Sequence, residues 1–173
     1  MGTWHYARGM AFARTGRPDA AETERAALLA VLADPALRQV SVWDLNTGSG
    51  LLAVAERLLV GEIAASLGAH EDAIAILEAG VRLETALTYD EPPPWHLPVR
   101  HVLGAVLLDA GRLSEAEAIY QQALDRFPEN GWALYGLLDS LKAQGNTEEA
   151  AAVRGRLDTA WGAADVELIG SRF

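Results

Sequence analysis

The stretch from Leu103 to Pro128 reads LGAVLLDAGRLSEAEAIYQQALDRFP, and it carries the pattern that decides the fold. Apolar residues recur at helical spacing up to Gly111, a short polar turn follows, and apolar residues then recur until Pro128. A glycine can take the left-handed conformation that closes a helix. The segment Ser114-Glu115-Ala116-Glu117 has the form of a capping box that begins the next helix. The stretch therefore predicts two helices joined by a tight turn.

The same plan occurs four times along the chain. Three copies have glycines seven residues apart and an alanine five residues after the second glycine, and a fourth copy keeps the last two positions: Gly9/Gly16/Ala21, Gly61/Gly68/Ala73, Gly104/Gly111/Ala116 and Leu138/Gly145/Ala150. The first glycine and the alanine lack bulk, so they allow two helices to approach closely where they cross. A larger side chain there would overpack the contact at a cost of about 1–3 kcal/mol.

The third unit has small, apolar and aromatic residues at fixed spacings, namely Leu103-Gly104, Leu107, Ala116, Tyr120, Ala123 and Pro128. These spacings resemble those of the tetratricopeptide repeat, a helical hairpin of about 34 residues. Gly111 and Gly145 are 34 residues apart, as expected for adjacent repeats. The resemblance implies an all-α fold, a right-handed α-solenoid of four helical hairpins. We expect a single domain over residues 1–173, with hairpins at 3–33, 50–85, 97–127 and 131–162.

Two connections and a tail interrupt the regular repeat. Gly16 and Gly68 are 52 residues apart, and Gly68 and Gly111 are 43 apart, so residues are inserted within 33–49 and 88–96. Insertions in solenoids map to loops on one face, often the binding face. Solenoid ends need a cap. We therefore expect the tail, residues 163–173, to fold back over the last hairpin through its apolar side chains Val166, Leu168, Ile169 and Phe173.

Composition agrees with packed helices and excludes several classes of protein. The 173 residues include 32 Ala and 25 Leu, which disfavours a β-sandwich or barrel. The net charge of −10 repels phosphate, so we expect no nucleic-acid partner. The absence of cysteine excludes disulfides, thiol catalysis and cysteine zinc sites. No apolar run is long enough to span a membrane, so we expect no membrane partner.

The beginning of the chain carries no signal peptide, and on that basis we predict a cytoplasmic protein. Its first residues already read as helix and include Trp4 and Tyr6. This start predicts the C-terminal fragment of a longer repeat protein. The ratio of 13 Arg to 1 Lys, together with the high Ala content, is typical of a bacterial source with a GC-rich genome.

Motifs for catalysis, metals or cofactors do not emerge from the sequence. The segment Asn46-Thr47-Gly48-Ser49-Gly50 is rich in glycine but lacks the lysine of a phosphate loop, so we interpret it as a turn and a helix cap. His96 and His101 are five residues apart, which is not the spacing that places two ligands on one helical face. We therefore predict no enzyme, no catalytic residue, no metal site and no cofactor.

The resemblance implies that the first helix of each hairpin lines a groove that binds protein or peptide. Matching positions nominate ten groove residues: Tyr6, Met10, Arg14, Glu62, His101, Asp109, Trp132, Tyr135, Asp139 and Lys142. We add three residues of the second inserted loop to this set because their side chains are aromatic: Tyr89, Trp95 and His96. The expected function is a non-enzymatic scaffold for a protein or peptide of unknown identity. Because the chain has a single lysine, we do not expect it to capture acidic tails.

Two alternatives remain open at the level of sequence. In the first, the chain is part of a larger repeat protein, and the loop at residues 88–101 contributes to a pocket for a small molecule or a metal. In the second, two copies form a homodimer through an apolar end face of the first hairpin, near Trp4 and Tyr6.

Overall fold

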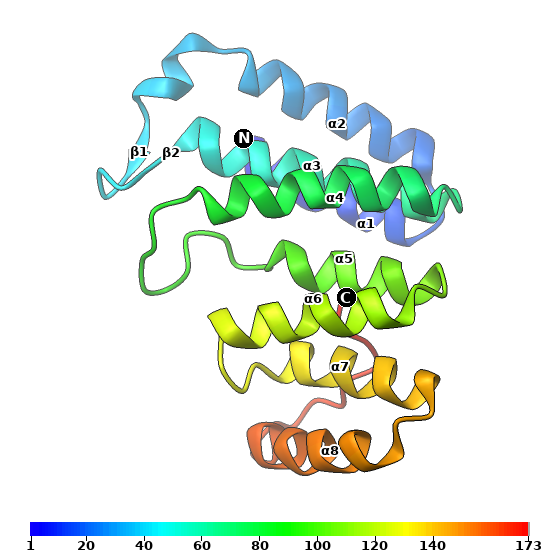
Figure 1. The fold of residues 1–173 in the computed structure, drawn as a ribbon. Coiled ribbons are helices and arrows are strands. Elements are labelled where there is room, and N and C mark those ends of the chain that lie inside the picture. Colours follow the sequence, from blue (N-terminus) through cyan, green and yellow to red (C-terminus); the bar gives the residue numbers. More distant parts are fainter. Residues whose placement is uncertain (173) are drawn as a thin grey trace. The chain divides into compact units, whose positions relative to one another are not determined.

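The computed structural model describes residues 1–172, and these form an all-α repeat fold of antiparallel helical hairpins (Figure 1). The helices pair in chain order as α1 (Gly2–Arg14) with α2 (Pro18–Leu32), α3 (Gly48–Ser66) with α4 (His70–Thr85), α5 (Val99–Asp109) with α6 (Leu113–Arg126), and α7 (Gly131–Gln144) with α8 (Thr147–Trp161). Each observed hairpin begins and ends within two residues of the bounds predicted from the sequence. The predicted hairpin architecture is therefore confirmed. No helix in the described part of the chain combines the length and apolarity needed to cross a bilayer.

The four hairpin turns use the glycines of the repeat in one conformation. The second glycine of each copy has a positive φ, with values of 71°, 76°, 74° and 81° at Gly16, Gly68, Gly111 and Gly145. A residue with a Cβ is strained in this left-handed region, which explains why the repeat has glycine at this position.

The chain divides into two compact units, and the boundary falls after Val99, at the start of α5. The first unit holds two hairpins and both inserted connections, and the second holds two hairpins and the tail. The prediction of one single domain stays a prediction.

In the first unit, α1 and α2 both pack on α3, and α3 packs on α4. The first glycine of each copy allows this packing. A Cβ added at Gly9 would lie 2.7 Å from Leu59 Cδ2, and one added at Gly61 would lie 2.7 Å from Leu77 Cδ2. Leu59 and Leu77 are fully buried, so these glycines provide the close approach that the sequence predicts.

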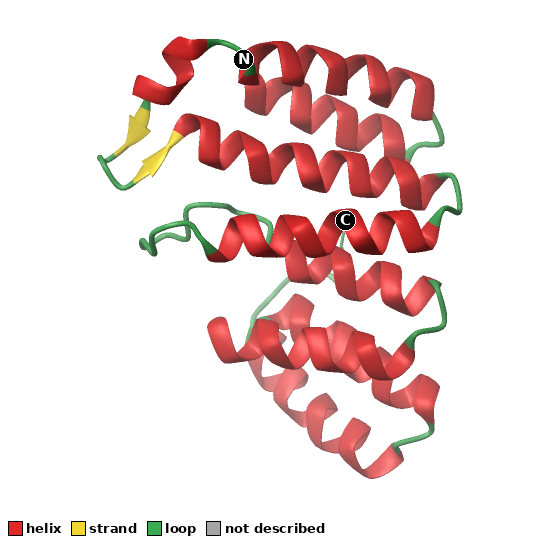
Figure 2. Ribbon diagram, turned by 45° about the horizontal axis from the view of Figure 1, so that its top comes forward, coloured by secondary structure: helices red, strands yellow, loops and turns green. Residues whose placement is uncertain are grey.

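The first inserted connection contains a 3₁₀ helix and a short β-hairpin (Figure 2). The helix η1 (Pro35–Gln39) begins at Asp34, whose side chain accepts a hydrogen bond from the Ala36 amide at 2.9 Å. Strands β1 (Ser41–Val42) and β2 (Asn46–Thr47) follow and pair antiparallel. The sequence indicated a helix cap within Asn46–Gly50, and Thr47 caps α3, but it did not indicate these strands.

Asn46 joins the two inserted connections of the first unit. Its amide nitrogen donates to the Thr88 carbonyl at 2.8 Å, and its Oδ1 accepts from the Thr88 amide at 2.8 Å. Because Asn46 is buried, this pair of hydrogen bonds fixes where the second connection leaves α4.

In the second unit, Tyr120 of α6 is the central packing residue. A Cβ added at Gly104 of α5 would lie 2.5 Å from Tyr120 Cζ, and one added at Gly136 of α7 would lie 2.1 Å from the same atom. The ring therefore passes between α5 and α7 over two glycines, and its hydroxyl lies 2.5 Å from the Ser171 hydroxyl of the tail.

The tail folds back in the second unit, but two of the apolar side chains that we predicted to cover the last hairpin do not do so. Leu168 is half-buried and lines a cavity with Tyr135 and Trp161. Val166 and Ile169 are 63% and 91% exposed, so their predicted role as a cap is wrong. Polar contacts hold the tail instead, including the hydrogen bond that the Trp161 indole donates to the Val166 carbonyl at 2.7 Å. Phe173, the last apolar residue of the predicted cap, lies outside the described residues.

The packing of Tyr120 predicts opposite effects for two glycine-to-alanine substitutions. Gly136→Ala should lower the free energy of unfolding by about 1–3 kcal/mol, because the buried Tyr120 ring has no room to move away. Gly155→Ala in α8 should raise it by about 0.5–1 kcal/mol, because no atom outside its own helix lies within 4 Å of the added Cβ. Chemical denaturation measures both. Equal effects of the two substitutions would contradict the proposed packing.

Candidate functional site

The ten predicted groove residues fall into two groups, one in each unit. Tyr6, Met10, Arg14 and Glu62 belong to the first unit, and the other six belong to the second, where they lie on α5 and α7.

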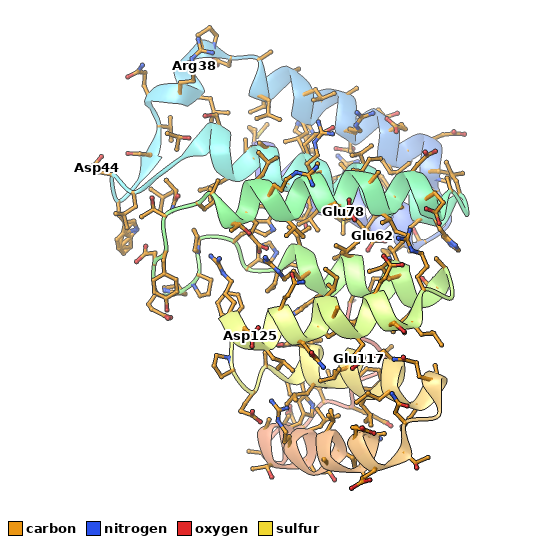
Figure 3. All side chains as sticks on the ribbon, viewed as in Figure 1. Arg38, Asp44, Glu62, Glu78, Glu117 and Asp125 are labelled. Atoms are coloured by element: carbon orange, nitrogen blue, oxygen red, sulfur yellow. The ribbon has the colours of Figure 1, made fainter. Side chains whose placement is uncertain are left out.

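In the first group, Tyr6 and Glu62 are buried rather than open to a ligand. Burial raises the pKa of the Tyr6 hydroxyl, and the nearby Glu62 carboxylate raises it further, so this phenol is neutral at physiological pH. An ion pair joins α1 to α3, with 3.6 Å between Arg14 Nη1 and Glu62 Oε1. Met10 is half-buried on the same helix as Tyr6. Figure 3 labels Glu62 on the ribbon of the first unit.

The second inserted connection packs against Tyr6 of the same unit. The Trp95 ring lies edge-on to the Tyr6 ring with 5.2 Å between centroids, and the exposed His96 ring lies 6.3 Å from it. Trp95 is buried, whereas Tyr89 is exposed and donates a hydrogen bond to the Glu91 carboxylate. Trp95 therefore belongs to the core of the first unit. A pocket around residues 88–101 stays a prediction.

The tail of the second unit runs back from α8 towards α5 (Figure 1) and contacts some of the predicted groove residues there. The Ser171 hydroxyl donates to the His101 carbonyl at 3.4 Å, which leaves the Tyr120 hydroxyl to donate to Ser171 at 2.5 Å. Arg172 Nη2 donates to Asp109 Oδ2 at 2.7 Å. Two adjacent tail residues thus contact α5 and α6 through three polar interactions.

Charges of both signs surround the Tyr120 hydroxyl. Burial raises its pKa most. The hydrogen bond with Ser171 and the charge of Arg172 lower the pKa, and the carboxylates of Asp139 and Asp109 raise it. Burial also raises the pKa of Asp139, although nearby cations oppose this effect, Lys142 first among them. The guanidinium of the tail therefore lies in a region with a carboxylate from α5 and another from α7.

Tyr135 also faces the tail segment. It lines a cavity of about 360 Å³ together with Arg154 and Trp161 of α8 and with Glu167 and Leu168 of the tail. Burial raises the pKa of Tyr135, with a further contribution from Asp139. Tyr135 thus lies on the same side of α7 as the tail.

Trp132 packs within the last hairpin. Its ring meets the Trp161 ring edge-on at 4.9 Å, and a Cβ added at the adjacent Gly131 would lie 2.3 Å from Trp161 Cε3. Trp132 therefore helps to hold α8 on α7, whereas Lys142, the last of the six, is exposed near the end of α7.

Three residues that contact one another here were not in the predicted set: Tyr120, Ser171 and Arg172. Tyr120 is part of the repeat pattern, but its spacing indicated only a packing role. The pairing of Arg172 with Asp109 joins positions 63 residues apart, and no local pattern in the sequence indicates it.

A second hollow of about 470 Å³ lies between α6, α7 and α8 and was not nominated from the sequence. Its polar lining includes Glu117 and Asp125 of α6, which Figure 3 labels, and Arg156 of α8. Glu117 accepts a hydrogen bond from the Gln144 amide at 2.7 Å, and Arg156 pairs with Glu129 at 2.7 Å. Glu117 and Arg156 are therefore already engaged in interactions within the unit.

His101 is a buried histidine without the surroundings of a metal ligand. Within residues 1–172, no three His, Asp or Glu side chains are grouped so that they could hold a metal ion. Burial lowers the pKa of His101 to about 4, and its buried Nε2 has no hydrogen-bond partner. The imidazole is therefore neutral at pH 7 and packs as an apolar ring.

The buried His101 predicts that the chain loses stability in mild acid. The unfolded chain binds a proton at this residue below pH 6.5, whereas the folded chain does so only near pH 4. Stability therefore falls as the pH falls through this window, by roughly 2 kcal/mol between pH 7 and pH 5. Denaturation at several pH values should show that His101→Leu removes this contribution.

The matched control is His96→Leu, the same change at an exposed histidine. It should leave the dependence of unfolding free energy on pH unchanged. An equal loss of pH dependence in both variants would show that burial of His101 is not its source.

Comparison with solved structures supports the fold. The structure described as "MamA RS-1 ArsTM double mutant" covers 92% of this chain and 74% of its own, with 14% identity and a TM-score of 0.60. Another, "MamA MSR-1 C2", covers 92% and 95% of the two chains, with 20% identity and a TM-score of 0.37. At 14% identity, the likeness to the first of these structures concerns the fold alone.

Comparison of sequences gives the family. A protein of Aquifex aeolicus (strain VF5), described as uncharacterized, is 38% identical over 61 residues. The match covers 34% of this chain and 8% of that protein, so the chain spans less than a tenth of its length. Two tetratricopeptide repeat models match residues 51–129 and 107–158, and together they cover more than half of the chain. The chain belongs to the tetratricopeptide repeat family.

Proposed function

We propose that this chain is a non-enzymatic scaffold that binds an extended segment of a partner protein on the second unit, along α5 and α7. The observation that carries the proposal is the tail itself. An extended stretch of polypeptide lies on this surface and is held through the Tyr120 hydroxyl, the His101 carbonyl and the Asp109 carboxylate. The binding surface is defined here as Asp109, the Tyr120 hydroxyl, Tyr135 and Asp139, and is called the α5–α7 surface below.

The packing beneath the α5–α7 surface supports this function. Tyr120 is fixed between Gly104 and Gly136, so its hydroxyl has one position relative to α5 and α7. Each repeat contacts its neighbour through such packing. A surface held in this way loses little conformational freedom when a ligand binds, which favours affinity.

The charge of the α5–α7 surface indicates the kind of partner. Asp109 places a carboxylate 2.7 Å from the tail arginine, the Asp139 carboxylate acts on the Tyr120 hydroxyl, and the whole chain has a net charge of −10. Complementary charge steers partners and excludes those of like charge. The proposed ligand is therefore a basic segment, in agreement with the expectation that acidic tails are not captured.

A second candidate function is pairing of two copies through the first hairpin. Trp4 is 50% exposed, with the Arg8 guanidinium 4.2 Å from its ring centroid, and the Phe12 ring lies near the guanidinium groups of Arg8 and Arg17. Tyr6, which the sequence placed on the same face, is instead buried under Trp95. The stripe on α1 that is open to a partner therefore consists of the exposed Trp4 and Arg8 and the half-buried Phe12.

Light scattering after size exclusion tests this pairing. The wild-type chain should have the mass of a dimer, and Trp4→Glu should reduce it to that of a monomer, because a carboxylate would be buried at the interface. Trp43→Glu is the control, since Trp43 is a highly exposed tryptophan between β1 and β2. A monomeric wild-type chain at every concentration, or equal effects of both variants, would rule out pairing through α1.

Selection from a library of displayed random peptides tests the proposed peptide binding. The selection is made on the wild-type chain and on Arg172→Glu, because the tail arginine lies on the α5–α7 surface. Enriched peptides should be basic, and Asp139→Lys on α7 should weaken their binding about tenfold or more, a loss of at least 1.4 kcal/mol.

The control is Asp125→Lys, which makes the same charge change at an exposed position of α6. It should leave binding of the enriched peptides unchanged, and circular dichroism checks that both variants are folded. The proposed function fails if neither chain enriches any peptide, or if Asp139→Lys and Asp125→Lys have the same effect.

A further inference from the structure

The contact between the tail and the α5–α7 surface has the character of a bound ligand more than that of a structural cap. A cap holds a helix bundle by burying apolar side chains, yet Val166 and Ile169 of the tail are mainly exposed. Burial is concentrated at the far end, where Ser171 is 4% exposed and the Arg172 side chain is 15% exposed. Two consecutive polar residues therefore provide the recognition.

The first of these residues occupies a site for a small hydroxyl group. The Ser171 hydroxyl accepts from the Tyr120 hydroxyl and donates to the His101 carbonyl, so both of its hydrogen-bonding roles are used. The His101 carbonyl can only accept a hydrogen bond, so Ser171 donates to it and accepts from the Tyr120 hydroxyl. A residue without a hydroxyl would leave the buried Tyr120 hydroxyl without this partner, and such a loss is costly in a buried place.

The second residue occupies a site for a guanidinium group. Arg172 Nη2 lies 2.7 Å from Asp109 Oδ2, and the Asp139 carboxylate acts on the same region around the Tyr120 hydroxyl. Charge-assisted hydrogen bonds from a guanidinium are stronger than neutral ones. An acidic residue at this position would be repelled by the Asp109 carboxylate.

The tail is also a weakly held occupant. The Asp109 side chain is 53% exposed, so water and salt screen its ion pair with Arg172. Between Gly162 and Gly170, Leu168 is half-buried and the other residues are exposed, so this stretch adds little apolar burial. A tethered segment remains bound because its effective concentration is high, of millimolar order for a short linker. A partner that binds the same site more tightly than this can displace it.

We propose that the α5–α7 surface is a recognition site for an extended peptide in which serine is followed directly by arginine, and that Ser171 and Arg172 occupy it as an internal competitor. A partner with this dipeptide displaces the tail. This inference rests on the proposed function, because it names the ligand and the regulation of the same surface.

Binding of a labelled peptide tests the inference. The probe is AADVELIGSR, the sequence of residues 163–172, with fluorescein at its N-terminus and an amide at its C-terminus. Fluorescence anisotropy measures its affinity for the full chain. Arg172→Glu should bind the probe about tenfold or more tightly than wild type, because the altered tail is repelled and the site becomes free.

Three controls separate recognition from general charge effects. Arg38→Glu makes the same charge change at an exposed residue of the first unit and should bind the probe as wild type does. A probe that carries Ala and Glu in place of its Ser and Arg should not bind Arg172→Glu. Adding Asp109→Lys to Arg172→Glu should abolish binding of the original probe.

The outcomes distinguish this inference from the proposed function. The proposed serine-arginine site is wrong if Arg172→Glu binds the probe no better than wild type, or if the altered probe binds Arg172→Glu as well as the original probe does. The scaffold function would still stand if the library enriches other peptides whose binding depends on Asp139. If the tail is only a structural cap, Arg172→Glu should lower the melting temperature without any gain in probe binding, and that result would also overturn the inference.

Discussion

The contact on which the second unit depends is the passage of the Tyr120 ring between α5 and α7. A phenol ring needs two facing positions without side chains to cross between helices at this distance, and Gly104 and Gly136 provide them. The contact sets the separation of α5 and α7, because the ring fills the space that a Cβ would take. It also places the Tyr120 hydroxyl on the α5–α7 surface, where the hydroxyl lies beside Ser171. One residue thus couples the packing of the repeat to the chemistry of its binding surface.

In each of the two units an irregular segment is held against a buried tyrosine, but the chemistry of the contact differs. Each has a buried tyrosine contacted by an irregular segment of its own unit: Trp95 lies on Tyr6, and Ser171 lies on Tyr120. The first contact is aromatic and buried, and its segment is fixed at one end by Asn46, so it resembles a core. The second is polar and has a partly exposed ion pair. A segment held by few polar contacts exchanges with a competitor far more readily than one held by buried rings.

The sequence predicted the helices well because their signals are local. The turn glycines need positive φ, the capping residues act within one turn, and the helical spacing of apolar residues is visible over a few turns. The two strands were missed because each has two residues and pairs through backbone groups, which leaves no periodic pattern. The ion pair between Arg172 and Asp109 was missed for another reason. It joins residues that only the folded backbone brings together, and neither residue type is unusual in its own segment.

The position of the tail differs from the apolar cap that the sequence predicted, and the difference has a physical cause. Four apolar residues suggested a cap that is stabilised by burial, but the position of the segment depends on the hydrogen-bonding and charged groups of the neighbouring helices. Around the Tyr120 hydroxyl they offer a carbonyl and two carboxylates, so a serine and an arginine are bound there while Ile169 stays in water. Buried polar groups need a partner, and this need outweighs the small gain from covering an isolated isoleucine. The same argument makes the α5–α7 surface selective, because a ligand must satisfy the tyrosine hydroxyl and one carboxylate at the same time.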